Sequence, residues 1–402
     1  MIEKSTIPFY IICLFAVIRT AITLSFFSTH GMFGYKFLEL FGLLSSYGLI
    51  ILFLICLSSF KFDKLFILIS FFCIYTLLSL SWGSNLQETI RFLLPFVIFF
   101  AVRSALTSKD QVKLLAFLII LSFIIPIIGS SLLILMKKSL YLTVYQTGID
   151  RYSGMYLKIH TLAHCMLIFF FIAAIYQRLG FRLPIKEKYI NILFFFLSIL
   201  ALFNLYKSVT RTVWIGLIVF SSFYLIGKRK YLILLLCGSG LFFIVLLSSQ
   251  LQSMLFDIIQ PLQGQGQISN IGSGRLGGWT GMVMSFLNEP LEMQFLGLGI
   301  GSEVKSFFGG SHNDLMSLLI SLGYLGLSMY LLIYVFVVFD IIKSKIDRVM
   351  KFIFLGIVFS VITMNFGSNS YLSRFELGQY FYLIIALFYI LDNQCRKKQL
   401  AD

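Results

Sequence analysis

Long apolar runs dominate this chain, and they constrain what it can fold into more than any other feature. Residues 65–82 read LFILISFFCIYTLLSLSW, without one charged side chain. A helix needs about 20 mainly apolar residues to cross roughly 30 Å of hydrocarbon. Hydrophobic residues make up 59% of the chain and charged residues 12%, against about a quarter charged in soluble domains. A water-soluble enzyme is therefore excluded, and an all-α, polytopic integral membrane protein is predicted.

The apolar runs are long enough for about 12 transmembrane helices. Arg19 interrupts the first run and no small-residue cleavage signature follows it, so we expect a retained helix rather than a removed signal peptide. The expected spans lie near 7–28, 40–60, 65–82, 90–106, 114–136, 159–177, 190–206, 212–227, 231–250, 313–340, 352–365 and 378–391.

The net charge of +15 is explained first by membrane topology. Lys and Arg are nearly twice as numerous in the alternate segments that include the two termini as in the opposite set. Cytoplasmic loops carry such an excess, so both termini are predicted to lie in the cytoplasm. Most of the positive charge is then an orientation signal, and we expect lipids rather than nucleic acid as the surroundings.

Neither a metal nor a cofactor is expected. Five of the six cysteines fall within expected spans, and no Cys/His ligand motif occurs. His160 and His164 are four residues apart on one helix face, but no glutamate follows the first histidine as in HExxH. His164 is interpreted as a buried polar contact, and His160 as a residue facing the outer cavity. No phosphate-binding loop for ATP is present.

Two outer loops are candidates for function. The large loop 251–312 begins in a Gly-rich stretch and continues as GWTGMVMSFLNEP, which predicts a short amphipathic helix that ends before Pro290. The loop 137–158 places Tyr145 and Tyr152 near basic residues. Such tyrosines suit sugar stacking, and equally an aromatic belt at the membrane interface.

Four arginines stand in separate outer segments, against the orientation signal. Guanidinium groups bind phosphate oxygens in a bidentate manner, so these arginines are candidate ligands of an anionic substrate. The alternative is snorkelling or pairing with outer carboxylates such as Asp150 and Glu376. The four are Arg151, Arg211, Arg275 and Arg374.

His312 is the candidate general base. It lies in the sequence SHNDL, where the large loop meets a span. An imidazole can take a proton from a hydroxyl nucleophile at neutral pH. Ser311, Asn313 or Asp314 can instead simply cap the following helix.

Four fragments around these residues resemble the O-antigen ligase and polymerase superfamily, which are membrane glycosyltransferases of bacterial polysaccharide assembly. The most specific is the last, in which SHN precedes a helix with a G-x-x-G pattern. The fragments are DRYSGMYLKIHTLAH, SVTRTVWIGL, GSGRLGGW and GLGIGSEVKSFFGGSHNDLMSLLISLGYLGL. The resemblance implies a GT-C-like glycosyltransferase that works without metal on the periplasmic face of the inner membrane.

By the same resemblance, Arg211 and Arg275 hold the pyrophosphate of an undecaprenyl-linked donor, and Arg151 helps to bind it. His312 deprotonates the acceptor hydroxyl. Supporting roles fall to Arg374, to His160, to Asn313 and Asp314 beside the imidazole, and to Tyr145 and Tyr152 for stacking. A flippase and a chain-length regulator of the same pathway are the expected protein partners.

Two activities compete within the superfamily. A Wzy-type polymerase joins lipid-linked repeat units, whereas a ligase transfers the finished polymer to lipid A core. Ser321 stands where ligases usually have an acidic residue, which favours the polymerase. Two other classes of protein are alternatives. A lipid-oligosaccharide flippase or transporter predicts charged residues near the middle of the membrane and similarity between the two halves of the chain. A cell-wall polymerase of the shape-and-division type needs a catalytic acid in the large loop.

Overall fold

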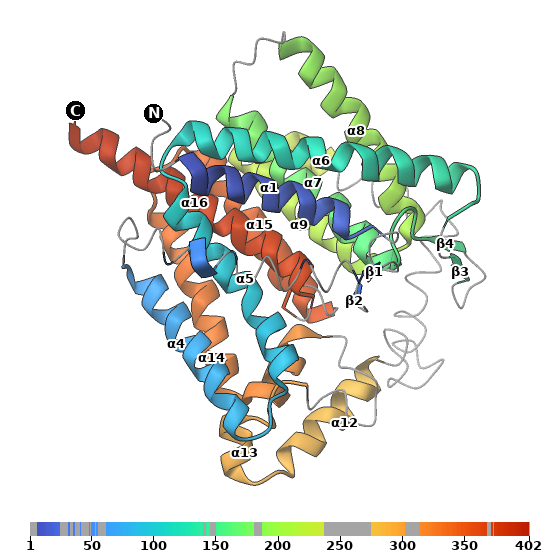
Figure 1. Ribbon diagram of the computed structural model, residues 1–402. Coiled ribbons are helices and arrows are strands. Elements are labelled where there is room, and N and C mark those ends of the chain that lie inside the picture. The colour runs from blue at the N-terminus through green and yellow to red at the C-terminus, as the bar shows by residue number, and fades with distance from the viewer. Residues whose placement is uncertain are drawn as a thin grey trace.

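The protein is described by a computed structural model in which helices predominate (Figure 1). The structure describes residues 6–24, 31–32, 35–36, 41, 48, 50–52, 54, 62–139, 142–144, 150–180, 187–236, 275–301, 313–367, 371–372 and 374–401. The helices are α1 (Thr6–Ile22), α4 (Lys64–Leu78), the 3-10 turn η2 (Ser79–Ser81), α5 (Leu86–Ala105), α6 (Lys109–Leu135), α7 (Ile159–Leu179), α8 (Glu187–Ser208), α9 (Arg211–Gly227), α12 (Arg275–Leu287), α13 (Leu291–Leu296), α14 (Asp314–Lys343), α15 (Arg348–Gly367) and α16 (Phe375–Ala401).

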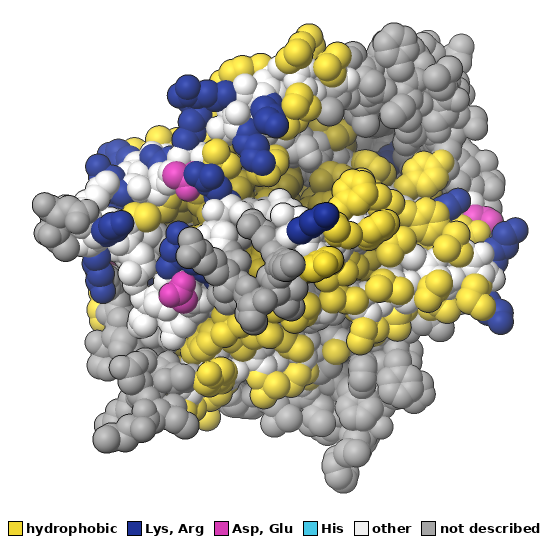
Figure 2. Space-filling model, turned by 90° about the horizontal axis from the view of Figure 1, so that it is seen from above, with side chains coloured by type: hydrophobic (Ala, Val, Ile, Leu, Met, Phe, Trp, Pro, Cys, Tyr) yellow, Lys and Arg dark blue, Asp and Glu magenta, His cyan; other side chains and the backbone are white. Residues whose placement is uncertain are grey.

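Six helical stretches among the described residues are long and apolar enough to cross a membrane. Large apolar side chains on these helices face outward, such as Phe195, which is 62% exposed. Figure 2 shows a broad stretch of apolar side chains with Lys and Arg side chains on either side of it. Most of these Lys and Arg side chains lie toward the side of the two termini. The six stretches are Lys64–Ser81, Lys109–Leu135, Ile159–Leu179, Lys188–Ser208, Asp314–Lys343 and Arg348–Gly367.

These helices confirm the coarse expectation of an all-α, membrane-embedded protein. The count of about 12 spans and the GT-C-like architecture stay predictions. Of the expected spans, those near 40–60 and 231–250 lie mostly outside the described residues.

Helix packing gives the bundle two ends. Helix α15 packs along α9, α16 along α5 and α1 along α6, while α7 is the most buried of the six apolar stretches (Figure 1). At one end α8 and α15 finish and α7, α9, α14 and α16 begin; we call this the site end. At the other, the terminal end, α1 begins and α16 finishes. Three ion pairs lie at the terminal end, namely Arg103–Asp63 at 2.6 Å, Arg178–Asp347 at 2.9 Å and Arg396–Asp392 at 2.7 Å.

Helix α14 is broken at Gly323, which corrects the expectation of one continuous span over 313–340. The φ of Gly323 is 65°, so residues 314–322 and 324–343 form two helical segments. A break frees backbone carbonyls, which lipid cannot solvate. Here the Ile320 carbonyl accepts from the Leu298 N–H at 2.8 Å, and the Ser321 carbonyl from the Gly299 N–H at 2.9 Å. The segment after α13 therefore completes the hydrogen bonding of the broken helix.

A tyrosine of α4 also forms hydrogen bonds to the backbone at this break. The Tyr75 hydroxyl of α4 donates to the carbonyls of Leu322 at 3.0 Å and Leu296 at 2.8 Å. On the other side of the segment, the Asn85 N–H donates to the Ile300 carbonyl at 3.0 Å. Residues 296–300 are thus held between α14 and the α4–α5 turn.

Both candidate loops contain regular structure. Loop 137–158 carries an antiparallel hairpin of β3 (Leu142–Val144) and β4 (Asp150–Tyr152), in which Thr143 pairs with Arg151. A second short hairpin joins β1 (Gly31–Met32) and β2 (Tyr35–Lys36). Within 251–312, the expected helix lies in α12, which ends at Leu287, and Pro290 precedes α13. The Gly-rich stretch before α12 lies outside the described residues.

We expect Gly297→Ala to lower the unfolding temperature. The φ of Gly297 is +83°, and a Cβ there would lie 2.4 Å from the Ser321 carbonyl oxygen. A strained backbone of this kind costs about 1–3 kcal/mol. Gly278→Ala in α12 is the matched control, because nothing lies within 4 Å of its added Cβ. Thermal unfolding in detergent measures both, and equal unfolding temperatures would contradict the role given to residues 296–300.

Candidate functional site

The structure describes most, but not all, of the residues that the sequence singles out. Arg275 is the first residue of α12, and its side chain is outside the described part. His312 and Tyr145 also lie outside it. The described candidates are Arg151, Tyr152, His160, Arg211, Asn313, Asp314 and Arg374.

Arg151 lies at the turn between α8 and α9. Its Nε donates to the carbonyl of Ser208, the last residue of α8, at 3.2 Å. The Thr210 hydroxyl donates to the same carbonyl at 3.3 Å, and Arg211 then begins α9. A guanidinium from the hairpin therefore lies at the turn from which Arg211 projects.

Tyr152 follows Arg151 in β4 and is buried. Its hydroxyl donates to the Asp150 carboxylate at 3.3 Å. Burial and this carboxylate both raise the pKa of the Tyr152 phenol. The side chain is therefore a neutral hydrogen-bond donor at neutral pH.

Asn313 caps α14, the alternative that the sequence left open. Its side-chain oxygen accepts from the N–H groups of Leu315 at 2.9 Å and Met316 at 3.2 Å. Its amide nitrogen donates to the carbonyl of Phe366, near the end of α15, at 3.0 Å. One side chain thus fixes the start of α14 against the end of α15.

Asp314 holds the connection between α15 and α16. Its side chain is fully buried, at 0% exposure. One carboxylate oxygen accepts from the N–H groups of Tyr371 at 2.9 Å and Leu372 at 3.0 Å. These contacts belong to the backbone of the connection, so the carboxylate has a structural partner whatever else it contacts.

The end of α15 also meets the start of α9. A Cβ on Gly367 would lie 2.7 Å from the Thr212 methyl group, so the lack of a side chain at this position permits the close approach. A continuous series of contacts therefore runs from Arg151 through the α8–α9 turn to Gly367, and on to Asn313. The structure brings Arg151, Arg211, Asn313 and Asp314 to one end of the bundle.

Arg374 stands just before α16 and is largely buried. Burial lowers the pKa of its guanidinium, whereas the carboxylates of Glu376 and Asp314 raise it. Its Nη1 has no hydrogen-bond partner among the described residues. The pairing with Glu376 that the sequence offered as an alternative stays a prediction.

His164 of α7 packs against the connection between α15 and α16. His164 is fully buried, and its ring meets the Tyr371 ring edge-on with centroids 5.4 Å apart. His160 lies one turn nearer the start of α7. Among the described residues, no group of three or more His, Cys, Asp and Glu side chains is arranged to hold a metal ion.

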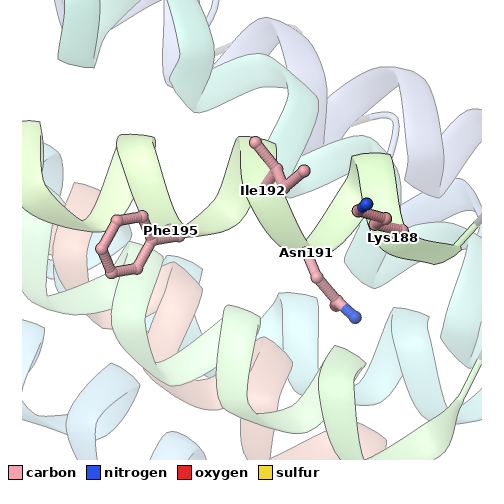
Figure 3. A pocket seen from close by; sticks show the side chains of 4 residues that line it. All are labelled: Lys188, Asn191, Ile192 and Phe195. Atoms are coloured by element: carbon pink, nitrogen blue, oxygen red, sulfur yellow. The ribbon is translucent and has the colours of Figure 1, made fainter.

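A surface hollow on α8 is separate from this site. Figure 3 shows its lining, Lys188, Asn191, Ile192 and Phe195, along one helix. Phe195 is 13 residues before Ser208, or about 20 Å at 1.5 Å per residue. The hollow therefore lies toward the terminal end.

Sequence reasoning missed several residues that build the site. Thr212 and Gly367 are close in space although they are 155 residues apart in the sequence. Tyr371, in the α15–α16 connection, contacts His164 of α7. Nothing in the local sequence indicates either contact.

Comparison with known proteins adds no relative. No family model matches the chain, and no curated protein matches it.

We expect Asp314→Ala to destabilise the protein much more than Asp314→Asn. Alanine leaves two buried N–H groups without an acceptor, at about 1–3 kcal/mol each. Asparagine keeps an oxygen acceptor in place for these two N–H groups. Unfolding temperatures in detergent distinguish the two variants. Equal losses would show that the charge, rather than the acceptor, is what the fold requires.

Proposed function

We propose that the chain is a membrane glycosyltransferase similar to the O-antigen ligase and polymerase superfamily. It joins oligosaccharide repeat units, carried on undecaprenyl pyrophosphate, into O-antigen or a related surface polysaccharide. In this proposal the protein lies in the bacterial inner membrane, with its termini in the cytoplasm and its site end facing the periplasm.

The observation that carries the proposal is the contact between Arg151 and the Ser208 carbonyl. It brings one guanidinium to the turn at which Arg211 begins α9. An anion gains favourable electrostatic energy where positive side chains from separate segments meet. Guanidinium groups match phosphate oxygens in geometry and charge, so a lipid diphosphate is the ligand that this arrangement suits.

The reaction transfers a glycosyl group from the diphosphate to a sugar hydroxyl. The acceptor oxygen attacks the anomeric carbon, and the bond from that carbon to the phosphate oxygen breaks. Negative charge grows on the leaving diphosphate, where Arg211, Arg151 and Arg275 stabilise it. Because arginines supply this charge, the proposed mechanism needs no metal.

His312 acts as the general base. It takes the proton of the acceptor hydroxyl as the new glycosidic bond forms. Its neighbour Asn313 is fixed against the end of α15, close to the start of α9. This placement of the adjacent residue supports, for His312, a position near the arginines.

Reconstitution tests the proposal directly. Purified protein in liposomes receives lipid-linked repeat units, with and without lipid A core. A ladder of products without core supports the polymerase. Transfer that occurs only with core indicates the ligase instead, and movement of the lipid across the bilayer without bond formation would identify a transporter and contradict the proposal.

We expect His312→Ala to slow chain formation by about 10²–10⁴-fold, the usual contribution of a general base. The control is His30→Ala, since the mechanism gives His30 no role. Both variants should reach wild-type levels in the membrane. Chain formation at the wild-type rate in His312→Ala would remove His312 from the mechanism.

We expect Arg211→Lys to lower the rate as well, because an ammonium group does not reproduce the planar guanidinium fork. Arg178→Lys is the matched control, since Arg178 pairs with Asp347 at the terminal end. Initial rates in the reconstituted system measure both. An equal effect of the two substitutions would show that Arg211 contributes only positive charge and that the geometry of its guanidinium group does not matter.

A further inference from the structure

Helices α12 and α13, which follow one another beside the break in α14, expose apolar side chains. Met284 and Leu287 of α12 are exposed, and Leu291 and Phe295 of α13 are 70% and 58% exposed. Apolar side chains grouped in this way mark a surface that contacts another apolar phase or molecule. We call these two helices the α12–α13 unit.

A buried glutamine fixes the two helices of the unit to one another. The Gln294 amide nitrogen donates to the carbonyls of Leu287 at 3.0 Å and Glu289 at 2.8 Å. These carbonyls lie at the end of α12 and just beyond it, where a helix has no further N–H groups to offer them. The apolar side chains of α12 and α13 therefore belong to one fixed surface.

The other side of the unit packs on α14 at its break. Met282 and Phe286 of α12 form a buried cluster with Ile320, which precedes the break. The rings of Phe286 and Phe295 each meet the Tyr324 ring edge-on, with centroids 5.7 Å and 5.9 Å away. Tyr324 is the first residue after the break, so the unit is docked at that level of α14 (Figure 1).

The length of α14 beyond the break indicates the level of Tyr324 in the membrane. Residues 324–343 are about 20 in number and about 30 Å long, which is the thickness of the hydrocarbon layer. This segment is long enough to cross the layer by itself, which places Tyr324 and Lys343 near its two borders. Tyrosine is enriched at such borders.

The exposed face of α13 continues the lipid-facing surface of α14. Leu325 and Val335 of α14 are exposed on a stretch that is long and apolar enough to span a membrane. The Phe295 ring contacts the Tyr324 ring, and both side chains are exposed in part. An apolar helix face that adjoins a lipid-facing surface at the border of the hydrocarbon is covered by the same acyl chains.

We propose that the α12–α13 unit lies in the border of the bilayer, with Leu291 and Phe295 among lipid acyl chains. This part of the large loop is then bound to the membrane and does not project into water. Residues 296–300 follow α13 directly and complete the hydrogen bonding of the broken α14. Lipid thus supports the segment on which the break depends. The inference goes beyond the proposed function, since it holds whatever reaction the site carries out.

Photo-crosslinking to lipid tests the inference. Benzoylphenylalanine is introduced in place of Leu291 or Phe295 in the full-length protein, which is irradiated in nanodiscs of phosphatidylethanolamine and phosphatidylglycerol. Val335 of α14 is the lipid-facing control, and Asp110, whose side chain is 82% exposed near the start of α6, is the control in water. We expect lipid adducts at Leu291 and Phe295 at the yield found for Val335, and a loss of adducts at Asp110.

Mass spectrometry of the adducts identifies what covers the surface. Phospholipid adducts support the inference. Adducts to a second copy of the chain would make this face a protein interface, and adducts to a small amount of added undecaprenyl diphosphate, in preference to the excess phospholipid, would make it a donor-binding surface. Either result overturns the inference, as does the absence of adducts at both positions while Val335 reacts.

A second measurement needs no crosslink. Leu291→Cys and Asp110→Cys are treated in nanodiscs with a membrane-impermeant maleimide, and the wild-type reaction is subtracted to account for the native cysteines. Both positions are exposed, so neither substitution removes a buried contact. We expect slow labelling at position 291, fast labelling at position 110, and equal labelling after unfolding in dodecyl sulfate. Equal rates in the folded protein would place the unit in water and overturn the inference.

Discussion

The site end of the molecule depends on two adjacent side chains at the start of α14. Lipid cannot hydrogen-bond to the backbone, so helix ends within a membrane protein must find partners in the protein itself. Asn313 meets this need for two N–H groups of its own helix and for a carbonyl at the end of α15. Asp314 does so for two N–H groups of the α15–α16 connection. Because α15 also touches the start of α9, these few bonds set the position of the segment that follows His312 relative to Arg211.

Much of the helical structure could be predicted from the apolar runs, because the length of a helix in lipid is set by the thickness of the hydrocarbon. The expected run 159–177 corresponds to α7, and 352–365 lies within α15. The break at Gly323 could not be predicted. SLGYLGL continues an apolar helical pattern, and the break is stabilised by Leu298, Gly299 and Tyr75, which approach from other parts of the chain. The β3–β4 hairpin could not be predicted either, because strands of only three residues leave too short a pattern in the sequence.

The candidate site was predictable in its residue types but not in its contacts. The outer arginines could be predicted as candidates because they oppose the charge bias of the loops. Capping of the following helix by Asn313 was one of two interpretations of the sequence SHNDL. The bond from Arg151 to Ser208 joins residues 57 positions apart, and no local pattern indicates it. Arg19 was visible as a charge within an apolar run, but that run does not indicate its burial or its contact with the Phe41 ring.

The central claim is that the arginines at the α8–α9 turn and the segment before α14 form one diphosphate site. The most direct measurement is an electron cryo-microscopy structure of the protein in nanodiscs with undecaprenyl diphosphate bound. The account predicts diphosphate density in contact with the side chains of Arg151 and Arg211, with the His312 ring on the side where an acceptor sugar would enter. Diphosphate bound elsewhere, for example beside the basic residues of the terminal end, would contradict it.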